Sequence, residues 1–175
     1  FNPYLYKSTD KGESWSSIAS NIPERTLVWR LVQDHVNSKL MFLATEFGIY
    51  FTIDAGKNWI KMNGGLPTIS FRDLAIQKRE NDLVGASFGR GFYILDDYSA
   101  LRDISEEQLK KEATMFPIRK AWWYIPRPAQ AFSPRGSMGA QHYVAENPPF
   151  GAVFTYYIAE SLTTKESERK KAEKK

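Results

Sequence analysis

The hydrophobic positions of this sequence fall in short runs separated by turn-forming residues such as Asp, Asn, Gly and Pro. Within most runs, apolar or aromatic residues alternate with polar ones, which is typical of β-strands because successive side chains of a strand point to opposite faces. The best-defined stretch predicts strands at residues 29–33, 40–45, 49–52 and 59–62, with turns at 34–38, 46–48 and 54–58.

A motif recurs along the chain at a nearly constant interval. The pattern Ser/Thr-x-Asp-x-Gly-x-x-Trp occurs twice, and its Asp residues, Asp10 and Asp54, are 44 positions apart. A degenerate third copy without the Gly and Trp places Asp97 another 43 positions on. Upstream, residues 28–30 align with residues 70–72 at an offset of 42. A repeat of about 40 to 45 residues built from short strands is the period of a β-propeller blade.

The residue types of the motif predict a structural role. Its Asp accepts hydrogen bonds from backbone N–H groups of its own turn, and its Gly adopts a positive φ. Its Trp buries a large apolar face between neighbouring sheets, with the indole N–H available to a turn carbonyl. Catalysis or Ca²⁺ binding is the less favoured alternative, because no calcium-loop set of oxygen ligands follows. The residues assigned this role are Ser8, Asp10, Gly12, Trp15, Thr52, Asp54, Gly56, Trp59 and Asp97.

These repeats resemble the Asp-box, or BNR, repeat of sialidases, xyloglucanase-type glycoside hydrolases and sortilin-type propellers. Residues 85–97 are similar to the last-blade segment of bacterial secreted proteins labelled glycosyl hydrolase or sortilin-like, with Phe88 where those proteins commonly carry His. Residues 147–158 look like the first strand of the Ig-like domain that follows the propeller in such proteins. The resemblance implies an extracellular, periplasmic or cell-surface location, and an Asp-box face that lies away from the active site.

We therefore expect an all-β chain that holds about two and a half four-stranded blades of a partial propeller. A closed propeller needs at least four blades, so the remaining blades of a longer parent chain, or partner chains, would have to complete the ring. The expected parts are propeller blades at 1–104; a short helix (105–113), a ring-closing strand (115–125) and a linker (126–139) within 105–142; the first Ig-like strand within 143–160; and a charged tail at 161–175.

Composition and charge narrow the classes of partner. The chain has 175 residues, 42% of them hydrophobic, and no apolar run long enough to span a membrane. Its net charge is +4, but residues 165–175 hold six Lys or Arg and three Glu, so most of the excess lies in the tail. A tail of mixed sign without aromatic residues is typical of a solvated helix rather than of a nucleic-acid-binding segment. We expect no nucleic-acid or membrane partner, and the absence of cysteine excludes disulfides and thiolate metal sites.

Chain direction places four charged side chains at the end of the blades opposite the Asp-box turns. If that turn joins the third and fourth strands, the turn between the second and third strands and the entry to the first strand lie at the other end. Arginines there could hold a carboxylate or a sugar, or they could pair with acids such as Asp73 or with carbonyls of the ring. The candidate ligand surface consists of Arg30, Glu46, Arg72 and Arg90.

The sequence identifies no catalytic residues. Glycoside hydrolysis needs two carboxylates about 5 to 10 Å apart, and Glu46 and Asp73 qualify by position only. The two histidines stand alone, so we expect no His-based triad, no metal site and no cofactor. Trp122 and Trp123 are interpreted as packed aromatics of the closing strand, with a sugar-stacking platform as the weaker alternative.

Three functions remain open from the sequence. The first is a portion of a secreted, glycosyl hydrolase-like or sortilin-like propeller that binds a glycan or a protein without a complete active site of its own. The second is part of a glycoside hydrolase whose catalytic carboxylates lie mostly outside this chain. The third is a sortilin-like peptide receptor. A carboxylate pair facing the channel would favour the enzyme, whereas an apolar wall beside an open edge strand would favour the receptor.

Overall fold

The computed structural model describes residues 2–123, 150–160 and 163–173. The chain divides into two compact units, Phe1–Ser105 and Glu106–Lys175. Strands in several antiparallel sheets dominate the described residues and helices are few, so the prediction of an all-β fold is confirmed. The sheets do not form a closed barrel or ring within the described residues, so the finer prediction of a propeller stays a proposal.

The first unit is built around a sheet of four strands, paired in the order β3 (Val28–Gln33), β4 (Met41–Thr45), β5 (Gly48–Thr52) and β6 (Ile60–Lys61). Every residue of β4 is buried. A strand that is covered on both faces has to be apolar throughout rather than alternating, which explains the continuous Met-Phe-Leu-Ala-Thr sequence.

A second sheet packs against one face of the first. It contains β7 (Phe71–Gln77), β8 (Asp82–Ser87) and β9 (Phe92–Leu95), paired in chain order. Gly85 in β8 allows the close approach of the two sheets, because a Cβ there would lie 3.1 Å from Cδ1 of Ile49 in β5. The 3₁₀ helix η1 (Tyr98–Arg102) follows β9.

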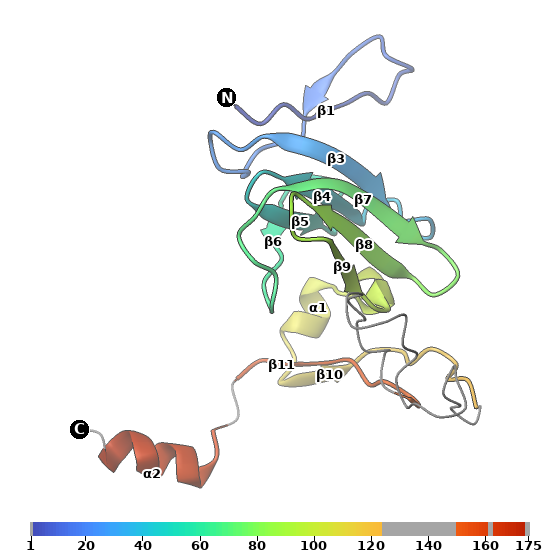
Figure 1. Ribbon diagram of the computed structural model, residues 1–175. Helices are drawn as coiled ribbons and strands as arrows, with labels where there is room; N and C mark the ends of the chain where they lie inside the picture. The colour runs from blue at the N-terminus through green and yellow to red at the C-terminus, as the bar shows by residue number, and fades with distance from the viewer. Residues whose placement is uncertain (1, 124–149, 161–162, 174–175) are drawn as a thin grey trace, which may run out of the picture. The chain divides into compact units, whose positions relative to one another are not determined.

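The sheets of the first unit lie in layers (Figure 1), and buried side chains fill the spaces between these layers. The core between the two larger sheets consists of Leu40, Phe42, Ala44, Ile49, Phe71, Leu74, Leu83 and Tyr98. The opposite face of the four-stranded sheet packs on the N-terminal segment, and this second core consists of Ile22, Met41, Leu43, Tyr50 and Trp59, with Leu5 and Ile18 beside it. The N-terminal segment contains the two-stranded ladder of β1 (Tyr6–Lys7) and β2 (Ser16–Ser17). Sheets that follow one another in sequence therefore lie face to face.

The described part of the second unit contains four short elements. The helix α1 (Glu106–Leu109) precedes β10 (Ala113–Met115), which pairs antiparallel with β11 (Tyr156–Ile158). The Tyr157 hydroxyl donates to the Leu109 carbonyl at 3.2 Å and so joins the end of the helix to the ladder. The helix α2 (Lys165–Glu173) lies within the charged tail.

The sequence expectations agree with the strands and turns of the first sheet to within two residues. They are less accurate in the second unit. The helix expected at 105–113 has only one turn, and the strand expected at 115–125 is limited to Ala113–Met115. Trp122 and Trp123 are not packed in a closing strand but are 70% and 93% exposed. The expected linker at 126–139 and the beginning of the segment 147–158 lie outside the described residues, and the strand within that segment is limited to Tyr156–Ile158.

Candidate functional site

Two side chains from equivalent strands stack on each other at the end of the sheets opposite the Asp-box turns. The register of β3 against β4 shifts between Val28 and Arg30, and that of β7 against β8 shifts between Phe71 and Asp73. The extra residues at these two bulges are therefore Trp29 and Arg72. A bulge bends its strand and redirects a side chain, and bulges are common beside functional sites.

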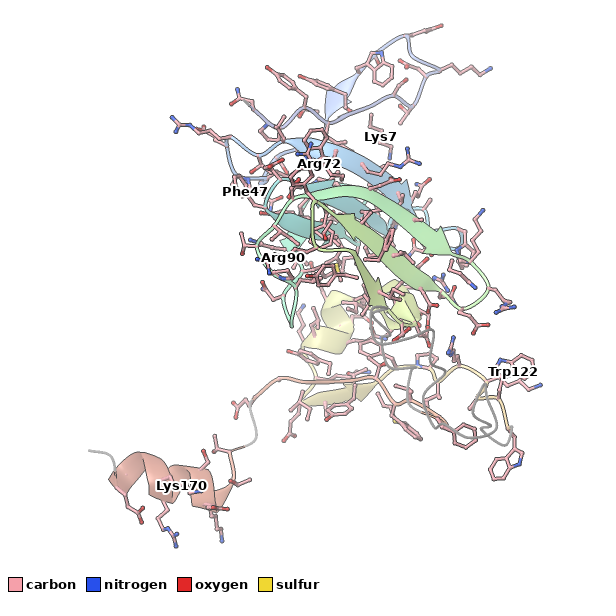
Figure 2. The ribbon with its side chains drawn as sticks, viewed as in Figure 1. Lys7, Phe47, Arg72, Arg90, Trp122 and Lys170 are labelled. Carbon is pink, nitrogen blue, oxygen red and sulfur yellow. The ribbon has the colours of Figure 1, made fainter. Side chains whose placement is uncertain are left out.

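Arg72 lies over the Trp29 ring, with 3.8 Å between its Cζ and the ring centroid. Its Cζ is also 5.0 Å from the centroid of Phe88, which follows β8. A guanidinium over an aromatic face is attracted by the negative charge of the π-system. The two layers thus build one aromatic and cationic surface, and Figure 2 labels Arg72 within it.

Glu46 fixes the tryptophan of this surface. It lies in the turn between β4 and β5, and its carboxylate accepts the Trp29 indole N–H at 2.9 Å and the Ser70 hydroxyl at 3.2 Å. Since Ser70 immediately precedes β7, the carboxylate joins the two sheets. A ring held in this way is preorganised for a ligand, because its orientation is set before binding.

Three of the four predicted surface residues belong to this cluster, which we name the Trp29–Arg72 surface: Trp29, Arg30, Glu46, Ser70, Arg72, Asp73 and Phe88. Arg30 and Asp73 form an ion pair at 3.4 Å, and both side chains are more than half exposed, so the pair contributes little to stability. Arg90 lies on the exposed turn between β8 and β9, and no ion pair or hydrogen bond joins it to the other three within the described part of the chain.

Exposed aromatic rings define what this surface can do chemically. Trp29 is 40% and Phe88 68% exposed, so flat apolar faces are open to solvent beside charged groups. Aromatic faces can stack on the apolar face of a sugar ring, and a guanidinium can donate to hydroxyl or carboxylate oxygens. The two carboxylates of the surface already have partners, since Glu46 accepts two hydrogen bonds and Asp73 pairs with Arg30. The geometry therefore favours binding over two-carboxylate hydrolysis.

Chain direction alone placed three of these residues at this end of the sheets, but it did not identify Trp29, Ser70 or Phe88. The predicted alignment of residues 28–30 with 70–72 is one residue out of register, because the bulges align Trp29 with Arg72 at an offset of 43. The same offset relates Gly48 to Gly91 and Asp54 to Asp97. A constant offset along the whole repeat was the signal that could have identified Trp29.

The Asp-box turns lie at the other end of the strands. Asp54 accepts the backbone N–H groups of Lys57 and Asn58, both at 2.9 Å, and the Thr52 hydroxyl at 2.7 Å. Burial raises the pKa of Asp54, but the hydrogen bonds within its turn together lower it to about 2. In this turn Gly56 has a φ of 89° and Trp59 is 3% exposed.

The first copy of the motif has similar hydrogen bonds within its turn, but the environment of its tryptophan differs. Hydrogen bonds from Ser14 and Ser8 hold the pKa of Asp10 well below its usual range, and Gly12 has a φ of 97°. The Trp15 indole donates to the Gly12 carbonyl at 3.1 Å, yet its ring is 64% exposed rather than buried. Residues 18–22 cover Trp59, whereas no described segment covers Trp15.

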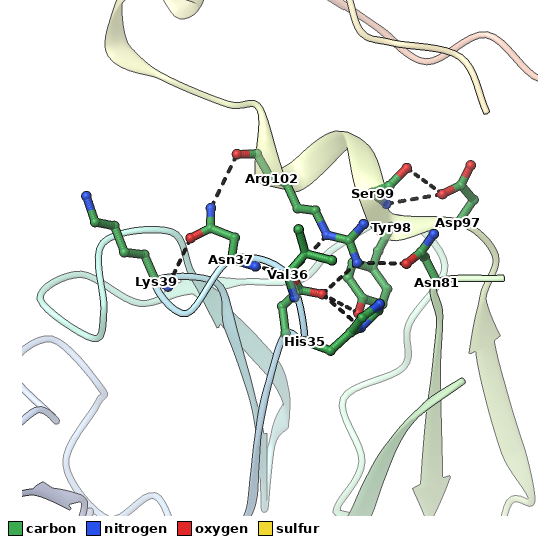
Figure 3. A network of polar contacts seen from close by, with 10 residues as sticks. His35, Val36, Asn37, Lys39, Asn81, Asp97, Tyr98, Ser99 and Arg102 are labelled. Carbon is green, nitrogen blue, oxygen red and sulfur yellow. Dashed lines mark hydrogen bonds and ion pairs between the residues drawn. The ribbon is translucent and has the colours of Figure 1, made fainter. Parts of the chain in front are cut away.

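The third copy of the motif forms part of a cluster of hydrogen-bonded polar side chains (Figure 3). Asp97 caps η1 by accepting from Ser99, and Arg102 stands where the repeat would have its tryptophan. Arg102 donates to both carboxylate oxygens of Asp34, at 2.9 and 2.7 Å, and the Tyr98 hydroxyl donates to the same carboxylate at 2.6 Å. Asn81 accepts from Arg102 at 2.7 Å. These groups have each other as partners, which indicates a structural role.

The opposite charges of Asp34 and Arg102 in this cluster stabilise each other. Burial raises the pKa of Asp34, but the hydrogen bonds from Arg102 and Tyr98 outweigh it and hold that pKa well below its usual range. Burial and the bond to Asp34 raise the pKa of Tyr98. His35 lies 3.5 Å from Asp34 through its Nδ1.

The described residues contain no group of three or more His, Asp or Glu side chains arranged to hold a metal ion. No helix among them has the length and apolarity needed to cross a membrane. Comparison of the chain with protein-family models, with curated proteins and with solved structures found no match.

Proposed function

We propose that this chain is a non-catalytic part of an Asp-box propeller and that its Trp29–Arg72 surface binds a carbohydrate. The stack of arginine, tryptophan and phenylalanine beside Glu46 is the observation that carries the proposal. Exposed rings held by fixed polar groups are the elements of a site that recognises the apolar face and the hydroxyls of a sugar.

Two observations support the propeller part of the proposal. Consecutive sheets stack face to face in chain order, and equivalent bulges recur one repeat apart. In a propeller, further blades of the parent chain would cover the exposed ring of Trp15 and the open face of the β7–β9 sheet. The resemblance to secreted Asp-box proteins supports an extracellular, periplasmic or cell-surface location.

The test is a binding experiment on the full chain. We would titrate it with a panel of neutral and acidic oligosaccharides and follow indole resonances by NMR. Trp29→Ala should weaken the binding of any positive glycan at least about tenfold, because the stacking face is lost. Trp123→Ala is the matched control, since that ring is 93% exposed and lies in the second unit. Absence of binding across the panel, or a loss caused by Trp123→Ala alone, would overturn the proposal.

A further inference from the structure

The loop between β6 and β7 (Figure 1) contains an Asn-Gly pair that is exposed to solvent. Residues 63–65, with the sequence Asn-Gly-Gly, are all exposed. Gly64 and Gly65 have φ values of 87° and 94°, and no heavy atom beyond their chain neighbours lies within 4 Å of the place where a Cβ of either would be. Residues with a Cβ rarely adopt such a φ, so this bend requires glycine. The backbone that follows Asn63 is therefore unhindered and open to water.

The seven asparagines of the chain differ in what restrains them. Four have side chains held by hydrogen bonds, and these are Asn21, Asn37, Asn58 and Asn81. Asn2 and Asn147 precede proline, which has no backbone N–H. Asn63 is the seventh, and neither its side chain nor the Gly64 N–H has a hydrogen-bond partner among the described residues. Only Asn63 thus combines a free side-chain amide with a free N–H on the next residue.

A side-chain amide in this position can close a five-membered ring with the backbone. The Gly64 nitrogen attacks Cγ of Asn63, a C–N bond forms, and the bond to the side-chain nitrogen breaks. That nitrogen leaves as ammonia and takes the proton of the Gly64 N–H. Water then opens the succinimide at Cγ, which gives aspartate, or at the main-chain carbonyl, which gives isoaspartate with the chain running through Cγ. One water is consumed and one ammonia is released, without oxidation or reduction.

We propose that Asn63 is a site of spontaneous deamidation and isomerisation, with water as the only co-reactant. Glycine at the next position has no Cβ to obstruct the attack on the side-chain carbonyl. At the four hydrogen-bonded asparagines, ring closure would first have to break the bonds that hold the side chain. The inference is independent of the carbohydrate proposal, since Asn63 does not belong to the Trp29–Arg72 surface.

The modification changes the charge at the end of the sheets that carries the Trp29–Arg72 surface. The loop starts beside β5, because the Met62 N–H donates to the Ile49 carbonyl at 2.8 Å. It ends at Ser70, whose hydroxyl donates to the Glu46 carboxylate. Both products carry a carboxylate in place of a neutral amide, so one negative charge is added there at neutral pH. Isoaspartate also adds a methylene group to the main chain.

Peptide mapping by mass spectrometry, during incubation of the full chain at mildly alkaline pH, tests the proposal. Asn63 should be converted at least about tenfold faster than each of the four hydrogen-bonded asparagines, and both aspartate and isoaspartate should appear at position 63. Unfolding in urea should speed the conversion of Asn37 at least about threefold, because its hydrogen bonds are lost. The rate at Asn63 should change less than about threefold, since the folded chain does not restrain it.

Two variants separate the attack of the Gly64 nitrogen from a general distortion of the loop. Gly64→Ala should slow the conversion of Asn63 at least about tenfold, because the added Cβ obstructs the attacking nitrogen. Gly65→Ala is the matched control: it adds a Cβ at a similar positive φ one residue further on and should leave the rate unchanged.

A third variant keeps the test decisive if an alanine disturbs the loop. Asn63→Gln leaves the backbone as it is, and it should form acid at position 63 at least about tenfold more slowly, because its longer side chain would have to close a six-membered ring. Conversion of Asn63 no faster than that of Asn37 in the folded chain, aspartate without isoaspartate, or equal rates for Gly64→Ala and Gly65→Ala would overturn the proposal.

Discussion

At the residue scale, the charge pair with the least exposed side chains among the described residues is that of Asp34 and Arg102. The Asp34 side chain directly follows β3 and is fully buried. Because it is shielded from solvent, water does not replace a lost hydrogen-bond partner. Arg102 satisfies both carboxylate oxygens and Tyr98 adds a third hydrogen bond. The pair therefore holds the end of η1 onto the turn after β3.

Replacing Arg102 with leucine should destabilise the chain by about 3 to 5 kcal/mol, because it leaves a buried carboxylate without its counter-ion. Urea unfolding of the two proteins measures the difference. Arg79→Leu is the matched control: that arginine is 83% exposed in its pair with Glu80, and its loss should cost less than about 1 kcal/mol. An equal loss in the free energy of unfolding for the two substitutions would contradict the role assigned to the buried pair.

The sequence predicted only half of this residue-scale feature. The turn at 34–38 follows from its composition, since Asp34 accepts the backbone N–H of Asn37 at 2.7 Å as Asp does in many turns. Its partnership with Arg102 joins positions 68 residues apart. No local pattern encodes such a contact, because it depends on how the two sheets pack.

At the scale of the element, the Asp-box turn that ends at Trp59 also binds the chain segment that precedes its sheet. The Trp59 indole donates to the Ile18 carbonyl at 2.7 Å, and its backbone exchanges hydrogen bonds with the Asn21 side chain. Gly56 lies so close to Ile18 that a Cβ would be 3.1 Å from it. The second copy of the motif therefore fastens its sheet to the preceding segment as well as closing its own turn.

Trp59 and Trp15, which occupy the same position of the motif, should therefore differ in how much their removal lowers the free energy of unfolding. Trp59→Ala should destabilise the chain by about 3 to 5 kcal/mol, because it opens a cavity in the second core and leaves the Ile18 carbonyl without its donor. Trp15→Ala should change the stability by less than about 1 kcal/mol, since that ring is 64% exposed. Urea denaturation followed by far-UV circular dichroism compares them, and an unchanged midpoint for Trp59→Ala would refute the structural account of the motif.

At the scale of the whole molecule, most of the excess positive charge lies in residues 165–175, where ion pairs within the helix α2 offset part of it. In α2, Lys170 pairs with Glu166 at 2.7 Å and Arg169 with Glu173 at 3.2 Å, each four residues apart. Such pairs on an exposed helix are weak, but they interrupt the continuous positive surface that binding to phosphates requires. The net charge of +4 is thus a property of the tail more than of the sheets.

We therefore expect no measurable binding of the full chain to duplex DNA at about 150 mM salt, as measured by fluorescence anisotropy. A variant that carries both Glu166→Gln and Glu173→Gln frees the two cations and should bind at low salt, with an affinity that falls steeply as salt rises. If the unmodified chain binds as tightly as this variant, a nucleic-acid partner would have to be considered.

The sequence by itself determined the strands of the first sheet, the turns between them and the spacing of the repeats, because alternation and turn chemistry act between near neighbours. It also placed Arg30, Glu46 and Arg72 at one end of the sheets, since chain direction alone fixes that. Only the tertiary structure decided that bulges bring Trp29 and Arg72 into contact, and that Trp59 is buried while Trp15 is exposed. Each of these depends on which layer lies beside a residue, and packing between segments distant in sequence sets that.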